Sequence, residues 1–365
     1  MATYQEQRER EYQNKLVKRF QDELGYKYLG NWQYAKGETA NSLGKQNSPI
    51  LDDEVRKFLK DQKKEDGKTP KYTERQIEDV LFQLKSKARL GNAKMSGLMQ
   101  CNTDLYDALM MGIKAQPDPE SNHEDVMLFD FEDFTNNNFA IAEEVSYIDP
   151  LLGKNKRPDI VDYVNGIALA VIELKRSLVN YEEGIKQHLS NERDFIPSFF
   201  TTTQFTIASN DGVEFRYGTI GTPLKFWCKW KRDTNKLGDV LTEQESYMMF
   251  FNNENFMFFF RYGVLNDGGR LGHGVGRRVQ LADMFVRLRH IQLKRRLGGV
   301  EKDLVVRLPL NHLLGPHELP IKHIVDQVAE DILLALEQIR QGTDVDLGLG
   351  RNILERCRGV ADLQK

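Results

Sequence analysis

Hydrophobic positions in the first quarter of the chain repeat at helical spacing. They predict a helix over residues 4–24, whose apolar face carries Tyr12, Leu16, Val17, Phe20 and Leu24. Gly25 follows where a left-handed cap would end that helix. Thr73 and Gln76 form a capping box ahead of a second helix, with an apolar face made by Ile77, Val80, Leu81 and Leu84. Between the two, residues 52–71 alternate in charge and predict an exposed helix followed by a flexible turn.

From Asn138 onward the period changes from helical to extended. Strands are predicted over residues 139–147, 159–164, 167–175, 204–209 and 213–220, with turns at Asn165-Gly166 and at residues 210–212. A helix over residues 178–191, with Ser177 as its expected N-cap, separates the third strand from the fourth. This order favours an α/β fold, in which helices flank a central mixed sheet.

The last hundred residues have a different composition. Phe285 is the only aromatic residue after Tyr262, glycines cluster over residues 266–276 as a predicted linker, and Ile324–Gln341 has a strong amphipathic helical pattern. We therefore divide the chain into a first domain of residues 1–240 and a partly helical segment of residues 241–365. Two origins stay open for that segment, a genuine domain or the product of a reading-frame or fusion event.

Composition restricts the class of protein. With 40% hydrophobic and 29% charged residues, no apolar leader and no apolar run long enough to cross a bilayer, the sequence predicts a globular cytoplasmic protein with no membrane segment. The cysteines, Cys101, Cys228 and Cys357, are too far apart in sequence for a zinc-type pair. Because the net charge is -3, DNA binding would need a local basic patch, for which Lys154, Lys156 and Arg157 are the candidates.

The candidate chemistry lies at the end of one predicted buried strand. Residues 167–172 are all apolar, and Glu173-Leu174-Lys175 follows them directly, with Asp159 on the preceding strand. Burying these charges without partners would cost several kcal/mol, so we expect them to share a site with a cation or with each other. Asp159, Glu173 and the Leu174 carbonyl suit Mg²⁺, while Lys175 could orient or deprotonate a water that attacks a phosphodiester. A lone Asp ahead of Glu-x-Lys also occurs by chance in many proteins.

This site imposes a geometric condition on the hairpin. With an ideal two-residue loop at Asn165 and Gly166, Asp159 would face Ile172 and would lie on the opposite side of the sheet from Glu173. A bulge of one residue restores both carboxylates to one face. The chemistry therefore predicts a bulge around residues 165–167, with Gly166 in the left-handed conformation.

The segment RPDIVDYVNGIALAVIELK, residues 157–175, resembles the nuclease signature of the R subunit of type I restriction enzymes. The resemblance covers most of residues 5–235. Residues 9–17 with Gly25-Tyr26 are similar to that family's N-terminal helix, residues 138–145 to its first strand, and residues 196–219 to its closing hairpin.

The resemblance implies a PD-(D/E)xK restriction-endonuclease fold, Mg²⁺ and cleavage of double-stranded DNA, with catalysis carried by Asp159, Glu173 and Lys175. Glu9 matches a helical glutamate that approaches the metal through water in related nucleases, although an exposed helix glutamate is the simpler interpretation. The family often has a Gln-x-x-x-Tyr element on the next helix. Here Gln187 is present but Asn191 replaces the tyrosine, so only Gln187 is carried over as a DNA or active-site contact.

The chain departs from full-length R subunits because it contains no phosphate-binding loop of an ATP-driven translocase. Gly67-Lys68-Thr69 does not fit such a loop, since Gln62 stands five residues before Gly67 and Pro70 blocks a helix start. We therefore expect no ATP site in this chain. The main interpretation is the nuclease part of a truncated or split R subunit that works with methylase and specificity subunits and a separate motor. The alternatives are a stand-alone Mg²⁺ nuclease and a non-catalytic docking module that uses Ile324–Gln341.

Overall fold

The computed structural model describes residues 4–33, 48–64, 66–230 and 241–263. The expected Gly-rich linker and the helix at Ile324–Gln341 lie outside these residues. The chain divides after Gln280 into two units, and every described residue belongs to the first. This unit therefore extends beyond residue 240, where we placed the end of the first domain. Among the described residues, no helix is long and apolar enough to cross a membrane.

A mixed sheet forms the centre of the unit. Its six strands follow the order β1-β4-β7-β8-β9-β10, with bounds β1 (Lys27–Asn31), β4 (Phe139–Glu143), β7 (Ile160–Val164), β8 (Ile167–Lys175), β9 (Phe205–Asn210) and β10 (Glu214–Gly218). β1 runs parallel to β4 and β8 runs parallel to β9, whereas the other neighbours are antiparallel. The α/β class and the mixed sheet flanked by helices are confirmed.

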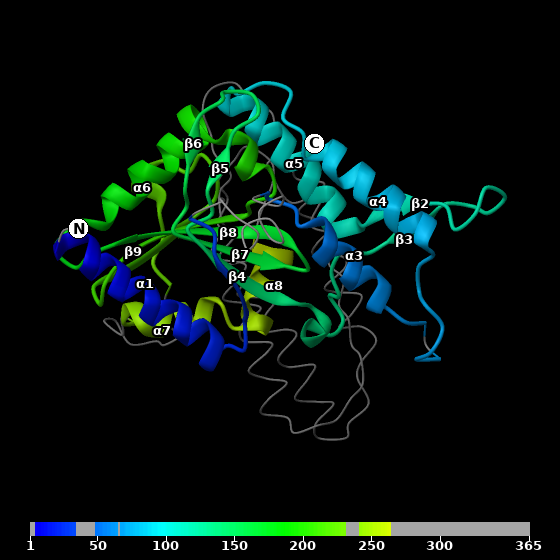
Figure 1. Cartoon of the computed structure of the whole chain (residues 1–365), viewed down its shortest axis with the longest axis horizontal. Helices are drawn as coiled ribbons and strands as arrows, with labels where there is room; N and C mark the ends of the chain where they lie inside the picture. The colour runs from blue at the N-terminus through cyan, green and yellow to red at the C-terminus, as the bar shows by residue number, and fades with distance from the viewer. Residues whose placement is uncertain (1–3, 34–47, 65, 231–240, 264–365) are drawn as a thin grey trace, which may run out of the picture. The chain divides into compact units, whose positions relative to one another are not determined.

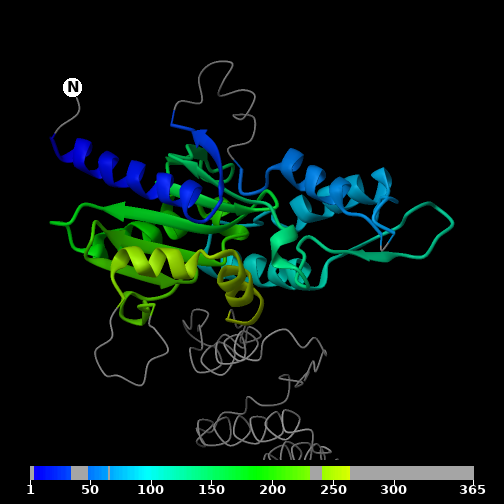
Figure 2. The same cartoon turned by 90° about the horizontal axis from the view of Figure 1, so that it is seen from below.

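Helices cover both faces of the sheet (Figure 1). On the upper side in that view lie α5 (Met95–Met111) and α6 (Tyr181–Ser190), while α3 (Asp52–Asp61) and α4 (Glu74–Lys87) lie to the right of the sheet. On the lower side of Figure 1, which faces the viewer in Figure 2, lie α1 (Tyr4–Asp22), α7 (Glu243–Phe250) and α8 (Asn253–Gly263). Two small hairpins, β2–β3 (Ile113–Ala115, Glu124–Val126) and β5–β6 (Tyr147–Ile148, Asn155–Lys156), complete the described elements besides short helical turns.

The two faces of the sheet bury different cores. Toward α1, α7 and α8 the core is aromatic, with Phe20 against Tyr247 and with Phe205 between Phe250 and Phe259. Toward α5 the core holds Val161, Tyr163, Val171, Leu98 and Phe199. Side chains alternate between the two faces along a strand. Asp159, two residues before Val161, and Glu173, two residues after Val171, therefore lie on this second face.

Several sequence predictions need correction in detail. The expected strand 139–147 ends at Glu143, because Glu144 adopts a left-handed φ of 52° and breaks the extended run. The helix after β8 begins at Tyr181, and Asn180, not Ser177, caps it by accepting a hydrogen bond from the Glu182 amide. α3 is not simply exposed, since it buries Val55, Phe58 and Leu59. The capping box of Thr73 and Gln76 is confirmed.

The β7–β8 hairpin contains the expected bulge, but not at the turn. Val164 pairs directly with Ile167, and Asn165 and Gly166 form a two-residue turn with φ values of 51° and 82°, as in type I′ hairpins. The register then shifts between the pairs Asp162↔Ala170 and Tyr163↔Ala168, which leaves Leu169 as the extra residue. The Leu169 carbonyl accepts a hydrogen bond from the Gln204 amide, 2.8 Å away, so the bulge is held by β9.

Asp162 on β7 is a buried carboxyl group that lowers the stability of the folded protein. Its side chain is fully buried, neither oxygen has a hydrogen-bond partner among the described residues, and burial raises its pKa well above the usual value of 3.8. The folded protein therefore keeps a proton on Asp162 that the unfolded chain releases at about pH 4. Its contribution to stability falls as pH rises from there toward the raised folded pKa.

We expect Asp162→Val to stabilise the protein by about 1–3 kcal/mol near neutral pH, because a β-branched apolar side chain suits a buried strand and removes the unpaired polar atoms. Urea unfolding between pH 4 and 8 measures this gain, which should grow with pH. Asp162→Asn is the control: it removes the titration but keeps buried polar atoms, so it should flatten the pH dependence without the full gain. A loss of stability in Asp162→Val at pH 8 would contradict this account.

Candidate active site

The two expected catalytic carboxylates converge at the end of the β7–β8 hairpin. Beyond the bulge, Ile160 pairs with Ile172, so Asp159 just before β7 and Glu173 on β8 lie next to each other on one face. Asp159 Oδ2 accepts a hydrogen bond from the Leu174 amide at 2.7 Å, and the charge of Asp159 raises the pKa of Glu173. The bulge at Leu169 therefore brings Asp159 and Glu173 to one face of the sheet, which is the effect that we expected from a bulge at the turn.

Burial makes the ionised form of both carboxylates unfavourable. Glu173 is fully buried, and its pKa is raised well above the usual 4.5 by burial and by repulsion from Asp159. Burial raises the pKa of Asp159 to about 6, although Lys175 and the Leu174 amide oppose that shift. Two adjacent buried carboxylates favour either a shared proton or a bound cation, which would lower the cost of ionising both.

Lys175 completes the group expected from the sequence. Its side chain is 16% exposed, and its Nζ lies 3.0 Å from the Leu174 carbonyl oxygen and 3.8 Å from Glu9 Oε1 on α1. Its positive charge lowers the pKa of both Asp159 and Glu173. Glu9 therefore lies at the edge of the site, next to the lysine.

Helix α6 holds Glu173 from the other side with two amides. Gln187 Nε2 donates to Glu173 Oε2 at 2.5 Å, and Asn191 Nδ2 donates to Glu173 Oε1 at 3.3 Å. Gln187 lies on α6 and Asn191 directly follows it, and α6 packs toward β8 and β9, where Gly184 lies close to Ala208. The structure thus brings Gln187 to the site as expected, and it adds Asn191, which we did not assign.

Two further residues at this end of the sheet were not assigned from the sequence. Gln13 of α1 donates from Nε2 to the Asp159 carbonyl at 2.9 Å, which fastens α1 to the start of β7. Glu144, whose amide donates to the same carbonyl, raises the pKa of both Asp159 and Glu173 by its charge. Gln13 could have been found as a polar residue within an apolar helix face, whereas nothing in the sequence marks Glu144.

The predicted basic patch is engaged with neighbouring groups. Lys154 Nζ donates to the Asp194 carbonyl at 2.7 Å, and Lys156 Nζ lies 4.2 Å from the centre of the Phe195 ring. Arg157 forms an ion pair with Glu144 and so carries its charge next to the carboxylates. Each of these cations already has a partner that DNA phosphates would have to compete with.

The donor set can be compared with the needs of a hard cation. Among the described residues, no group of three or more His, Cys, Asp or Glu side chains is placed to hold a metal. Mg²⁺ does not require such a group, because it binds through one or two carboxylates and keeps several waters. Asp159, Glu173 and the Leu174 carbonyl fit that requirement, and the hydrogen bond from the Leu174 amide orients Asp159 toward Glu173.

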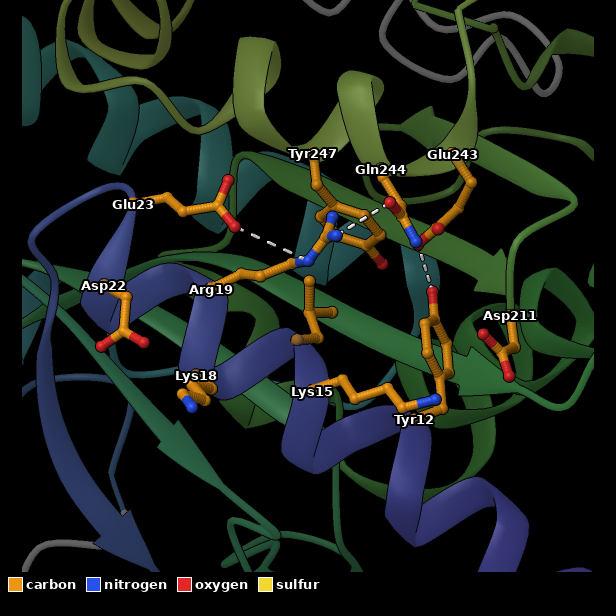
Figure 3. A pocket seen from close by; sticks show the side chains of 11 residues that line it. Tyr12, Lys15, Lys18, Arg19, Asp22, Glu23, Asp211, Glu243, Gln244 and Tyr247 are labelled. Atoms are coloured by element: carbon orange, nitrogen blue, oxygen red, sulfur yellow. Dashed lines mark hydrogen bonds and ion pairs between the residues drawn. The ribbon is translucent and has the colours of Figure 1, made fainter.

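A separate cavity lies on the opposite side of the sheet, between α1 and α7. Figure 3 shows Tyr12 and Arg19 of α1 opposite Glu243, Gln244 and Tyr247. Its volume is about 310 Å³. Tyr12 donates to Glu243, and Arg19 Nη2 donates to Gln244 Oε1 at 2.8 Å. These hydrogen bonds join α1 to α7. None of the expected catalytic residues lines this cavity.

Comparison with known proteins gives the family. The model of the type I restriction enzyme R protein N terminus matches residues 6–226, which include every candidate site residue. The chain belongs to this family. A relative from Methanocaldococcus jannaschii, named as a type I restriction enzyme MjaIXP endonuclease subunit, is 32% identical over 131 residues, covering 34% of this chain and 12% of the relative.

A second relative, the type I restriction enzyme HindI endonuclease subunit of Haemophilus influenzae, is 27% identical over 180 residues. That match covers 47% of this chain and 17% of the relative. The chain therefore matches only a small part of the length of both relatives.

Proposed function

We propose that this R-protein N-terminal domain is a PD-(D/E)xK nuclease that hydrolyses phosphodiester bonds of double-stranded DNA with Mg²⁺, as the cleavage part of a type I restriction system. The observation that carries the proposal is the convergence of Asp159 and Glu173 beside Lys175 at the end of a fully buried strand. The names of both relatives as endonuclease subunits support the same class of activity.

Each residue has a distinct part in the proposed reaction. Asp159, Glu173 and the Leu174 carbonyl would hold Mg²⁺, which when bound polarises the scissile phosphate. Lys175 offers its N–H groups to the attacking water and offsets negative charge that develops on the phosphate. Gln187 keeps one oxygen of Glu173 in place. Arg157, Lys154 and Lys156 would exchange their present partners for DNA phosphates, so binding should weaken with salt.

The proposed partners are the methylase and specificity subunits of a restriction-modification complex, and a separate motor chain that supplies translocation. We expect the DNA sequence to be read by the specificity subunit, as the resemblance to type I restriction systems implies. A free-standing nuclease is the competing form of the same chemistry, and partner dependence separates the two.

The test uses the full chain with plasmid DNA and ATP, with and without the methylase, specificity and motor subunits of a type I restriction system. Cleavage should appear with Mg²⁺ and vanish with a chelator, and it should require the partner subunits if the domain acts within the complex. Cleavage by the chain alone would favour the free-standing nuclease. Equal cleavage with the chelator, or none under any combination, would refute the proposed activity.

A further inference from the structure

Asn191 occupies a position where the resembling family usually has a tyrosine, and it contacts the buried carboxylate Glu173. Its side chain is 1% exposed, and its Nδ2 is 3.3 Å from Glu173 Oε1. The other oxygen, Oε2, is bound by Gln187 at 2.5 Å. Gln187 and Asn191 are four residues apart and therefore lie on the same face of α6, one helical turn from each other. Together they hold both oxygens of a single carboxylate.

The backbone at Asn191 changes from α-helical to π-helical. Residues Asn191–Phe195 form a single π-helical turn directly after α6, and such turns are rare and are frequently found at functional sites. The amide of Ile196 donates to the Asn191 carbonyl at 2.8 Å and closes the turn. Glu192, the next residue, is fully buried and accepts a hydrogen bond from the Gly221 amide at 2.7 Å. These two contacts anchor the turn at Asn191 and directly after it.

We propose that Asn191 is a positioning residue that, with Gln187, fixes the Glu173 carboxylate in the orientation that meets Asp159, so that the pair is preorganised for a divalent cation. This inference rests on the proposed function, because it assigns the metal to Asp159 and Glu173. The Asn191 amide reaches the Glu173 carboxylate from the start of a π-helical turn. The remaining Asn191 oxygen, Oδ1, is buried and has no hydrogen-bond partner among the described residues.

A carboxylate left without one of its two donors would sample other rotamers and would have to be reordered when it binds a cation. Removing the groups that orient a metal-binding side chain typically weakens metal affinity about 10–100-fold. We therefore expect Asn191→Leu, which has nearly the same size but no donor, to weaken cation binding by about tenfold. Asn191→Ala introduces no bulk that could clash, and it should give a similar loss.

The test is calorimetric binding of Mn²⁺, used as the probe, to the full chain without DNA. Wild type, Asn191→Leu, Asn191→Ala and Asp159→Ala are compared, with Ser190→Ala as the matched control from the neighbouring half-buried position. Thermal unfolding of each variant checks that the domain is folded. We expect Ser190→Ala to bind as wild type, both Asn191 variants to bind about tenfold more weakly at unchanged melting temperature, and Asp159→Ala to lose binding.

One result would refute the positioning role of Asn191 alone, and another would refute the proposed metal site. If Asp159→Ala loses Mn²⁺ binding while both folded Asn191 variants bind as tightly as wild type, the positioning role of Asn191 is refuted and the nuclease proposal stands. If Asp159→Ala binds Mn²⁺ as well as wild type does, the cation is not held by these carboxylates. In that case the proposed metal site fails, and the inference about Asn191 fails with it.

Discussion

Glu173→Gln should reduce DNA cleavage by the assembled restriction system by at least about 100-fold, the scale of loss typical for groups that act directly in catalysis. The reason is that an amide of the same shape cannot supply the negative charge that holds a divalent cation. Asp159→Asn should act in the same way. Lys175→Ala should slow cleavage by a similar factor but should leave the Mg²⁺ concentration for half-maximal rate nearly unchanged, because it removes no metal ligand.

The Glu173→Gln and Asp159→Asn variants should fold at least as well as the wild type. Glu173 is buried beside Asp159. Burial and the charge of Asp159 raise the pKa of Glu173, and burial raises the pKa of Asp159, so neutralising either one relieves a cost in the metal-free protein. The measurements are cleavage rates across a Mg²⁺ titration and melting temperatures without metal. Glu183→Gln on the exposed side of α6 is the matched control, because Glu183 pairs only with the nearby Lys186. Full cleavage by Glu173→Gln would remove this residue from the active site.

Strand periodicity predicted most of the fold around this site. The buried run 167–175 and its hairpin partner were evident from the sequence, because the six positions 167–172 before Glu173 all carry apolar residues. β1 was not predicted, since Lys27–Asn31 includes Lys, Gly and Asn and buries only one side chain fully. Its place at the sheet edge comes from pairing with β4, which local sequence does not encode.

The catalytic carboxylates could be predicted as a pair, but the place of the bulge could not. The register of the hairpin depends on contacts far away in sequence: the Gln204 amide binds the Leu169 carbonyl, and the Ala168 amide binds the Pro49 carbonyl. A similar limit applies to Asn191. Its spacing from Gln187 was visible, but its contact with Glu173 depends on how α6 packs against β8 and on the π-helical turn that follows.

Gly166 should tolerate no side chain, although it lies in an ordinary hairpin turn. Its φ of 82° is in the left-handed region, and an added Cβ would come within 2.8 Å of the Glu54 Cβ and 2.9 Å of both the Leu51 carbonyl oxygen and the Val55 amide nitrogen. Two of these neighbours are backbone atoms, so side-chain rotation cannot relieve the contact. The same backbone receives a 2.7 Å hydrogen bond from the Leu51 amide to the Gly166 carbonyl.

We therefore expect Gly166→Ala to lower the free energy of unfolding by about 3 kcal/mol or more, of which about 1–2 kcal/mol is left-handed strain and the remainder is overpacking. Two alanine substitutions separate these terms. Gly212 has a φ of 71° with open space around its Cβ position, so Gly212→Ala should cost only the strain. Gly91 has open space and no left-handed φ, so Gly91→Ala should change stability by less than about 0.5 kcal/mol.

Urea unfolding of the three variants measures these differences, and DNA cleavage links them to the site. The turn fixes the pairing of Val164 with Ile167, from which the bulge and then the meeting of Asp159 and Glu173 follow along the hairpin. A folded fraction of Gly166→Ala should therefore cleave less than an equal folded amount of Gly212→Ala. If the two variants lose the same stability, the close approach of α3 to the turn does not constrain Gly166, and the steric part of this argument is wrong.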